Sequence, residues 1–361
     1  MDRTTTPSLP CSPRLSVSIA LCTYNGERYL REQLDSFKNQ TRLPDEVVVC
    51  DDGSTDATFE ILESWKKTVP FSVNIVKNEW NLGYAQNFGK AISLCTKDVI
   101  FLSDQDDVWL PEKLDTMVRM LEENPDVGVA TSDGFIIDEN GTQLDGHAQL
   151  LAQNWFYDET TVFCVWHPTL RDCYPRGCAT AFRASLRDIL LPIPPHWSHD
   201  LWLNVVYRLR FQGKIVPQPL FEYRIYGGNW TQGSYANRVS GMDYKKRIFH
   251  WNAASQFMVN DALVSEFEER IRTVEPNKYV RKCIEYLAEN RKHFRNRERI
   301  QRNFFLFAPL LLLEVLTLRY FQHFHAWQAI GYDLWTGLKN GMNPVKTLNL
   351  LLRLLKKVAE K

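Results

Sequence analysis

The first 130 residues alternate short apolar runs with longer segments in which apolar residues recur every three or four positions. Short runs of this kind predict buried strands, and the periodic segments predict helices with one apolar face. We expect strands at residues 15–21, 46–50, 71–76, 99–102 and 127–131. We expect helices at residues 26–39 and 84–94, one capped by Thr55 or Asp56, and one that opens at Pro111 and ends before Asn124. This alternation predicts βαβ units, with a mostly parallel sheet and helices on both of its faces.

The pattern changes near residue 135, where Trp, Pro, Tyr and Gly become frequent. We interpret this stretch as a mixed substrate-binding region with one helix that begins near Ser198. From residue 240 onwards the chain is helical in character. The predicted organisation is therefore a flexible N-terminus (1–14), a main domain (15–235) with halves 15–130 and 131–235, and a helical extension (236–361).

The helical extension carries a basic segment followed by an apolar block, at residues 291–318. This segment predicts either a packed helical hairpin or an interfacial helix on anionic lipid, because basic amphipathic helices bind such surfaces. The final segment, 345–361, repeats the arrangement, with leucines on one face and basic residues around them.

Charge and cysteine content exclude several classes of protein. Lys plus Arg equals Asp plus Glu, at 43 each, which argues against a dedicated nucleic-acid binder. The eight cysteines form no C-x-x-C pair, so a zinc ribbon and a thioredoxin-type site are not supported. The N-terminus has no apolar signal-peptide centre, and the longest apolar run, at residues 304–313, is half of what a spanning helix needs. We expect a cytoplasmic protein without a transmembrane helix.

Polar and acidic residues follow the first four predicted strands. They are Thr23, Tyr24 and Asn25; Asp51 and Asp52; Asn78; and Asp104 and Asp106. Carboxyl ends of parallel strands meet at one edge of a sheet, where ligands bind. A strand-end carboxylate such as Asp51 suits the N–H groups of a planar ring, whereas Asp104 and Asp106 suit a hard cation, Mg²⁺ or Mn²⁺. Because neither a P-loop nor a G-x-G-x-x-G motif occurs, phosphate would be held through the metal.

Each of these motifs has a second interpretation. Asp51 to Ser54 could be a capped turn, and an Asp-x-Asp sequence could mark a phosphotransfer receiver or a phosphatase. Their order at successive strand ends favours a nucleotide diphosphate site.

Three segments, Ser18–Asn25, Val48–Asp56 and Leu102–Trp109, resemble the inverting family 2 glycosyltransferases. Residues 177–182, 199–202 and 223–229 are similar to bacterial rhamnosyltransferase-like enzymes of O-antigen and capsule assembly. The resemblance covers residues 15–235. It implies an α/β GT-A fold, which is a Rossmann-like nucleotide-binding sheet with a mixed acceptor half, followed here by the helical extension.

The resemblance also implies a function. This is metal-dependent inverting transfer of rhamnose or another hexose from a dTDP- or UDP-sugar to a growing, lipid-linked bacterial surface glycan. Such an acceptor implies peripheral association with the cytoplasmic face of the inner membrane. Two alternatives are a UDP-hexose or UDP-N-acetylhexosamine transferase of the same family, and a non-catalytic glycan- or nucleotide-binding scaffold.

Residue roles carried over from the resemblance fall into four groups. Thr23, Tyr24 and Asn25 would border the nucleotide, together with Asp51 at the pyrimidine base, Asp52 near the ribose, Asn78 and Asp104. Asp104 and Asp106 would hold the metal, and Asp200 would be the catalytic base. Substrate contacts are expected from Trp109, Gly177, His199 and Tyr226. Tyr226 stands where the family's Tyr-Arg-x-His-Gly segment carries His, which weakens the rhamnose assignment.

The chemistry of an inverting displacement agrees with the role of Asp200. The reaction needs one carboxylate to take the acceptor proton and a cation to stabilise the leaving diphosphate. Asp200 begins a predicted helix, where the dipole favours the ionised form, although an ordinary N-terminal acid would look the same. Should Asp200 not be the base, Asp172 and Asp188 are the next candidates. His199 and His196 lack a third soft ligand nearby, so zinc is not expected.

Overall fold

The structure is a computed structural model of the 361-residue chain. It describes residues 14–144, 176–195, 197–207 and 210–226, together with a few positions between 268 and 299. The chain divides into two compact units, of which the first contains residues 1–157 and 173–226 and the second contains residues 158–172 and 227–361. The sheet and the candidate site both belong to the first unit.

The first part of this unit alternates strands and helices, as the periodicity predicts. Its elements are β1 (Val17–Thr23), α1 (Leu30–Lys38), β2 (Glu46–Asp51), α2 (Thr58–Lys66), β3 (Ser72–Lys77), α3 (Tyr84–Leu94), β4 (Val99–Ser103), β5 (Val108–Trp109), α4 (Lys113–Glu123) and β6 (Val127–Ile137). Helix α1 begins at Leu30 rather than near Gly26, because the backbone N–H groups of Tyr29 and Leu30 both donate to the Gly26 carbonyl and close a turn first. The residue before α2, Ala57, makes no side-chain capping bond, but the Asp56 carboxylate accepts the backbone N–H of Thr58, the first residue of α2, at 3.0 Å.

The second part of the unit is less regular. It contains η4 (Gly177–Ala179), β7 (Thr180–Arg183), η5 (Ala184–Leu186), α5 (Arg187–Leu190), α6 (His199–Val206) and β8 (Gln212–Arg224). Helix α6 is the helix expected near Ser198.

All eight described strands form one sheet, in the order β3-β2-β1-β4-β7-β6-β8-β5. Strands β3, β2, β1 and β4 are parallel, whereas β7 runs antiparallel to both β4 and β6. The strand expected at 127–131 is therefore not the next parallel strand beside β4. The parallel register places Thr23 opposite Asp51 and Leu21 opposite Ser103, so the ends of β1, β2 and β4 lie together at one edge.

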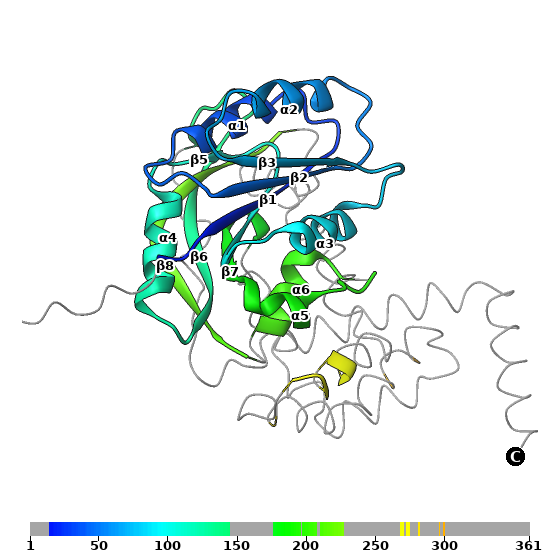
Figure 1. The fold of residues 1–361 in the computed structure, drawn as a ribbon, viewed down its shortest axis with the longest axis vertical. Coiled ribbons are helices and arrows are strands. Elements are labelled where there is room, and N and C mark those ends of the chain that lie inside the picture. Colours follow the sequence, from blue (N-terminus) through cyan, green and yellow to red (C-terminus); the bar gives the residue numbers. More distant parts are fainter. Residues whose placement is uncertain are drawn as a thin grey trace, which may run out of the picture. The chain divides into compact units, whose positions relative to one another are not determined.

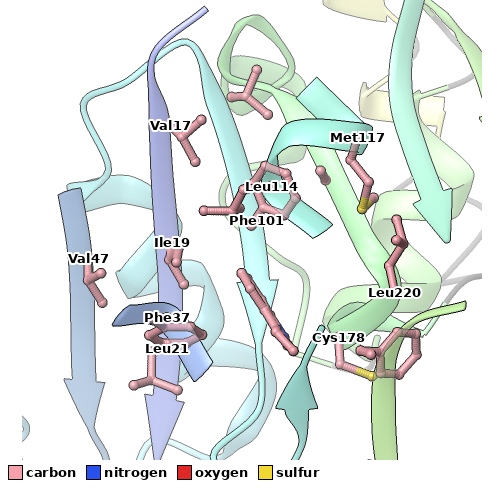
Figure 2. Packing of buried hydrophobic residues seen from close by; sticks show 14 of the residues in the cluster. Val17, Ile19, Leu21, Phe37, Val47, Phe101, Leu114, Met117, Cys178 and Leu220 are labelled. Atoms are coloured by element: carbon pink, nitrogen blue, oxygen red, sulfur yellow. The ribbon is translucent and has the colours of Figure 1, made fainter. Parts of the chain in front are cut away.

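Helices cover both faces of the sheet (Figure 1). Helices α1 and α2 lie on one face, where α1 contacts β5. Helix α4 contacts β6 and β8. Helix α3 packs on β1 and β2 from the other face and also contacts α6. Alternate residues of a strand face opposite sides. Val17, Ile19 and Leu21 of β1 accordingly join Phe37 of α1 and Leu114 of α4 in one core cluster (Figure 2). The fold is thus the mixed α/β arrangement that the sequence predicts.

The predictions for the chain ends lie outside the described residues. They concern the N-terminus before residue 14 and almost all of the extension from 236 to 361, including the basic and apolar segment 291–318. Among the helices that the structure does describe, none combines the length and the apolar character needed to cross a bilayer.

Candidate active site

Asp51, the last residue of β2, is completely buried. Its Oδ1 accepts hydrogen bonds from the hydroxyls of Thr23 and Ser54, and its Oδ2 accepts one from the Ser54 backbone N–H at 2.9 Å. Asp51 therefore fastens the ends of β1 and β2 to the turn that follows. The expected contact of Asp51 with a pyrimidine base stays a prediction.

Asp52 holds the loop between β3 and α3. Its carboxylate accepts the backbone N–H groups of Leu82 and Gly83, at 2.8 and 2.9 Å, and the side-chain amide of Asn78 at 2.8 Å. The side-chain oxygen of Asn78, Oδ1, in turn accepts a hydrogen bond from the Lys90 ammonium. Both Asp52 and Asn78 are buried. The structure thus gives these two residues a loop-holding role, and the expected ribose and nucleotide contacts stay a prediction.

The rim of the site is formed by Tyr24 and Asn25, which follow the buried Thr23. The Tyr24 side chain is 50% exposed. Its backbone N–H donates to Gln105 Oε1 at 2.8 Å, and the Gln105 amide donates back to the Tyr24 carbonyl at 3.1 Å. Asn25 adopts a left-handed backbone (φ 47°), and its side-chain oxygen accepts the Thr55 N–H. The loop after β1 is thereby joined both to the loop after β2 and to the acidic turn after β4.

The acidic turn, residues 104–107, concentrates negative charge. Asp104 and Asp106 are partly exposed, and Asp107 is buried. Burial, reinforced by the charges of Asp107, Asp106 and Asp200, raises the pKa of Asp104 well above its usual value. Burial also raises the pKa of Asp106, against a hydrogen bond from Tyr226 that lowers it. The turn is therefore short of positive charge.

Asp107 faces away from the exposed side of the turn. Its Oδ1 accepts the Arg224 backbone N–H at 3.3 Å, and its carboxylate also accepts the Cys178 thiol. Burial raises its pKa to about 7. Lys113, also fully buried, donates from Nζ to the Cys178 carbonyl at 2.5 Å, and burial lowers its pKa to about 8. The Lys113 and Asp107 charges offset one another beneath the turn.

The side chains of the turn fit a divalent cation. Ligand atoms of Asp104, Asp107 and Cys178 lie within 4.8 Å of one another. Burial keeps the Cys178 thiol protonated by raising its pKa, and the Lys113 ammonium would repel a second cation on that side. Carboxylate oxygens are the ligands that Mg²⁺ and Mn²⁺ prefer. The clustered ligand atoms thus include Asp104 but not Asp106 among the described residues, so Asp104 and Asp106 as a metal-binding pair stay a prediction.

Asp200 lies in the first turn of α6 and is partly exposed. Its charge acts on Asp104 and also raises the pKa of Tyr84, the first residue of α3, for which burial is the larger cause. The fold thus brings Asp200 to the acidic turn. Of the two alternative candidates for the base, Asp188 is held by Arg210 in a bidentate ion pair, with N–O distances of 2.8 and 2.9 Å. Asp172 lies outside the described residues.

His199 anchors α6 on α3. Its ring stacks on Phe88 with centroids 3.9 Å apart. Burial lowers its pKa, and neither ring nitrogen has a hydrogen-bond partner among the described residues. A Cβ on Gly177 would lie 2.5 Å from His199 Nε2, so glycine is needed for η4 to approach α6. Gly177 and His199 therefore pack against each other, and His196, the other histidine considered, lies outside the described residues.

Trp109 does not face the site. It is 2% exposed and belongs to the core cluster. Its ring contacts Phe37 edge-on at 4.8 Å, and the Lys113 ammonium lies 4.1 Å from its centroid. The expectation that Trp109 stacks on a sugar is wrong, because β5 turns this ring inward towards α1.

The sequence analysis assigned no role to two arginines at the site, although Arg224 lies in the segment 223–229 that carries the resemblance. Arg176, immediately before η4, lies over the Tyr223 ring at 4.5 Å, and its charge lowers the pKa of Asp104. Arg224, 1% exposed, donates from Nε to the Asp106 carbonyl at 3.0 Å. Neither residue follows one of the first four strands, where the sequence pattern directed attention.

Comparisons with known proteins agree with this geometry. The model of the family "Glycosyl transferase family 2" matches residues 18–190. The putative glycosyltransferase EpsE of Bacillus subtilis (strain 168) is 30% identical over 246 residues, which cover 68% of this chain and 81% of EpsE. An uncharacterized glycosyltransferase of Nostoc sp., alr2836, is 29% identical over 238 residues, covering 64% and 71% of the two chains. Residues 1–349 of S. aureus TarS, solved in complex with UDP, share the fold with a TM-score of 0.52 at 16% identity, covering 90% of each chain. The chain belongs to the family 2 glycosyltransferases.

Proposed function

We propose that this glycosyltransferase moves a sugar from a nucleoside-diphosphate sugar to a glycan acceptor by a single, inverting displacement that depends on Mg²⁺ or Mn²⁺. The observation that carries the proposal is the meeting of Asp104, Asp106 and Asp200 at the carboxyl edge of the sheet. Burial, reinforced by neighbouring carboxylates, raises the pKa values of Asp104 and Asp107, and a cation that brings a diphosphate with it would offset this negative charge.

The acidic turn would receive the diphosphate end of the donor. Asp104 and Asp106 would hold the cation, which when bound offsets the charge that develops on the leaving diphosphate. Arg176 adds a fixed positive charge near Asp104. Sequence reasoning found no basic group for the diphosphate, and Arg176 supplies one.

Asp200 would be the general base. In the displacement, the acceptor hydroxyl oxygen forms a bond to the anomeric carbon of the donor sugar, and the bond from that carbon to the diphosphate oxygen breaks. The acceptor proton passes to the Asp200 carboxylate, and the nucleoside diphosphate leaves. A single displacement inverts the anomeric configuration.

The nucleoside end of the donor would lie on the rim formed by Tyr24 and Asn25. The exposed Tyr24 ring offers a stacking face for a pyrimidine. Thr23 and Asp51 support this rim from below through their mutual hydrogen bond at 2.9 Å. We propose a UDP or dTDP donor, supported by the UDP that TarS binds in its solved complex.

The acceptor would be a growing, lipid-linked bacterial surface glycan, and the enzyme would meet it at the cytoplasmic face of the inner membrane. The supporting observation is the resemblance of residues 177–182, 199–202 and 223–229 to enzymes of surface-polysaccharide assembly. The donor sugar would be rhamnose, another hexose or an N-acetylhexosamine.

A panel of UDP- and dTDP-sugars tests the proposal directly. Release of UDP or dTDP is measured for each donor with a glycolipid acceptor, in Mn²⁺ and in EDTA, and the anomer of the product is determined by NMR. We expect metal-dependent release with one donor and an inverted product. Thermal protection by a donor without any release would instead support the scaffold alternative, and a retained anomer would overturn the single displacement.

A further inference from the structure

Tyr226 connects the end of β8 to the acidic turn. Its phenol hydroxyl donates a hydrogen bond to the Asp106 carboxylate. The residue lies two positions beyond Arg224, the last residue of β8. Asp106 lies in the turn after β4, so the bond joins two segments that are far apart in the sequence.

The Tyr226 ring is itself held in place. It packs on the Tyr29 ring with centroids 4.7 Å apart. The Tyr29 ring is also contacted by the guanidinium groups of Arg28, at 4.8 Å, and Arg224, at 4.6 Å. These contacts fix the direction in which the Tyr226 hydroxyl points.

Arg224 fixes the backbone of the same turn. Its Nε donates to the Asp106 carbonyl at 3.0 Å, and its backbone N–H donates to Asp107 at 3.3 Å. Its Nη2 donates to Glu32 of α1 at 2.5 Å. The main chain of Asp106 is thus anchored by Arg224, and its side chain is anchored by Tyr226.

We propose that Tyr226 is a positioning residue, which orients the Asp106 carboxylate so that its second oxygen is presented to a divalent cation. The inference rests on the metal site of the proposed function. It assigns to Tyr226 a role through Asp106, in place of the direct substrate contact that the sequence suggested.

The chemistry of the carboxylate makes both interactions compatible. An ionised carboxylate has two oxygens and about four acceptor positions, so one oxygen accepts the phenol while the other binds the cation. Without the phenol, Asp106 would rotate freely and avoid the negative charges of Asp104 and Asp107 nearby. Groups that hydrogen-bond a metal ligand commonly contribute about 10- to 100-fold to metal affinity.

Tyr29 supplies a matched control within the same pair of rings. Its hydroxyl is buried and has no hydrogen-bond partner among the described residues. Tyr29→Phe and Tyr226→Phe each remove one phenol oxygen and keep the ring packing. They differ in whether a hydrogen bond to Asp106 is lost.

The test is a titration of each full-length variant with Mn²⁺ at saturating UDP. Binding is measured by calorimetry and by the loss of the electron paramagnetic resonance signal of free Mn²⁺. We expect Tyr226→Phe to weaken Mn²⁺ binding about 10- to 100-fold and Tyr29→Phe to change it less than about twofold, because its hydroxyl bonds no carboxylate. In turnover assays, Tyr226→Phe should raise the Mn²⁺ concentration for half-maximal rate, with kcat at saturating Mn²⁺ largely retained.

The outcomes separate the inference from the proposed function. Tyr226→Phe with parental Mn²⁺ affinity would overturn the positioning role while leaving the metal site standing. A parent protein that binds no Mn²⁺ would overturn the metal site and the inference together. The melting temperatures of the two variants should agree closely. Equal losses of Mn²⁺ affinity in Tyr226→Phe and Tyr29→Phe would show that ring packing causes the effect, which would overturn the inference.

Discussion

Two groups of aspartates lie at the same edge of the sheet, and their surroundings differ. Asp51 and Asp52, at the end of β2, are buried, and neutral hydroxyl, amide and backbone N–H groups donate to their oxygens. Asp104 and Asp106, in the turn after β4, are partly exposed, and burial together with nearby carboxylates raises the pKa of Asp104. The two groups look alike in the sequence.

The difference shows which acids are available to a ligand. A carboxylate that accepts several hydrogen bonds in the folded protein is satisfied, and it holds the chain segments that donate to it. Carboxylates that crowd together in a buried site resist ionisation, and a bound cation would offset their charge. The first group therefore holds the loops around the site in place, and the second group would hold the metal and the diphosphate.

Removal of the metal should have the largest effect. Because Asp104 and Asp106 would hold the diphosphate through a cation, we expect EDTA to abolish transfer and Mn²⁺ or Mg²⁺ to restore it. The measurement is the rate of nucleoside diphosphate release before and after addition of metal. Full activity in the chelator would remove the distinction between the two acid groups, since neither would then hold a cation.

Asp200→Asn should lower transfer by about 10²- to 10⁴-fold, the usual contribution of a positioned general base. This corresponds to roughly 2.7–5.5 kcal/mol of transition-state free energy. The amide keeps the shape of the side chain but accepts no proton, so binding of UDP and Mn²⁺ should be nearly unchanged. Steady-state kinetics and calorimetry check the two parts, and transfer within a few-fold of the parent would place the base elsewhere.

Stability should change differently in the two acid groups. Asp52 accepts the Leu82 N–H with one oxygen and the Gly83 N–H with the other. Asp52→Asn turns one of these acceptors into a donor, so we expect the free energy of unfolding to fall by about 1–3 kcal/mol. Asp106→Asn removes one of several repelling charges, so stability should be unchanged or higher. Urea denaturation of both variants measures this, and equal losses in both would contradict the comparison.

The rim should contribute least. Tyr24→Ala removes the exposed ring, and we expect UDP to bind about 2- to 10-fold more weakly, the usual value of an aromatic stacking contact. Tyr24→Phe keeps the ring and serves as the matched control, with nearly parental affinity. Calorimetric titration with UDP measures the affinity of both variants. Parental affinity in Tyr24→Ala would show that the uracil ring of UDP binds away from this rim.

The parallel half of the sheet could be predicted well from the sequence. Strands β1, β2 and β4 are mostly apolar and fully buried, and each is followed directly by polar residues. The second half could not. Strand β8 contains Pro217 and Pro219, which lack backbone N–H groups, and its pairing with β6 is irregular near Pro219. Strand β5 has two residues, too few for any periodicity.

The candidate site could be predicted in position but only partly in roles. Adjacent acids in the sequence gave no sign that Asp52 and Asp107 are turned into the protein and that Asp104 and Asp106 stay partly exposed. The positive charges of the site, such as Arg176, come from segments beyond residue 110, where no strand-end pattern points to them. Such pairings depend on chain topology, and a single sequence does not reveal them.

Mn²⁺ binding tests the division of labour between the two acid groups most directly. It is measured in the presence of UDP for the parent, Asp106→Asn and Asp52→Asn, each checked for folding by circular dichroism. We predict one Mn²⁺ ion for the parent, loss of binding in Asp106→Asn, and binding within a few-fold of the parent in folded Asp52→Asn. Loss of Mn²⁺ binding in folded Asp52→Asn together with parental binding in Asp106→Asn would contradict the account.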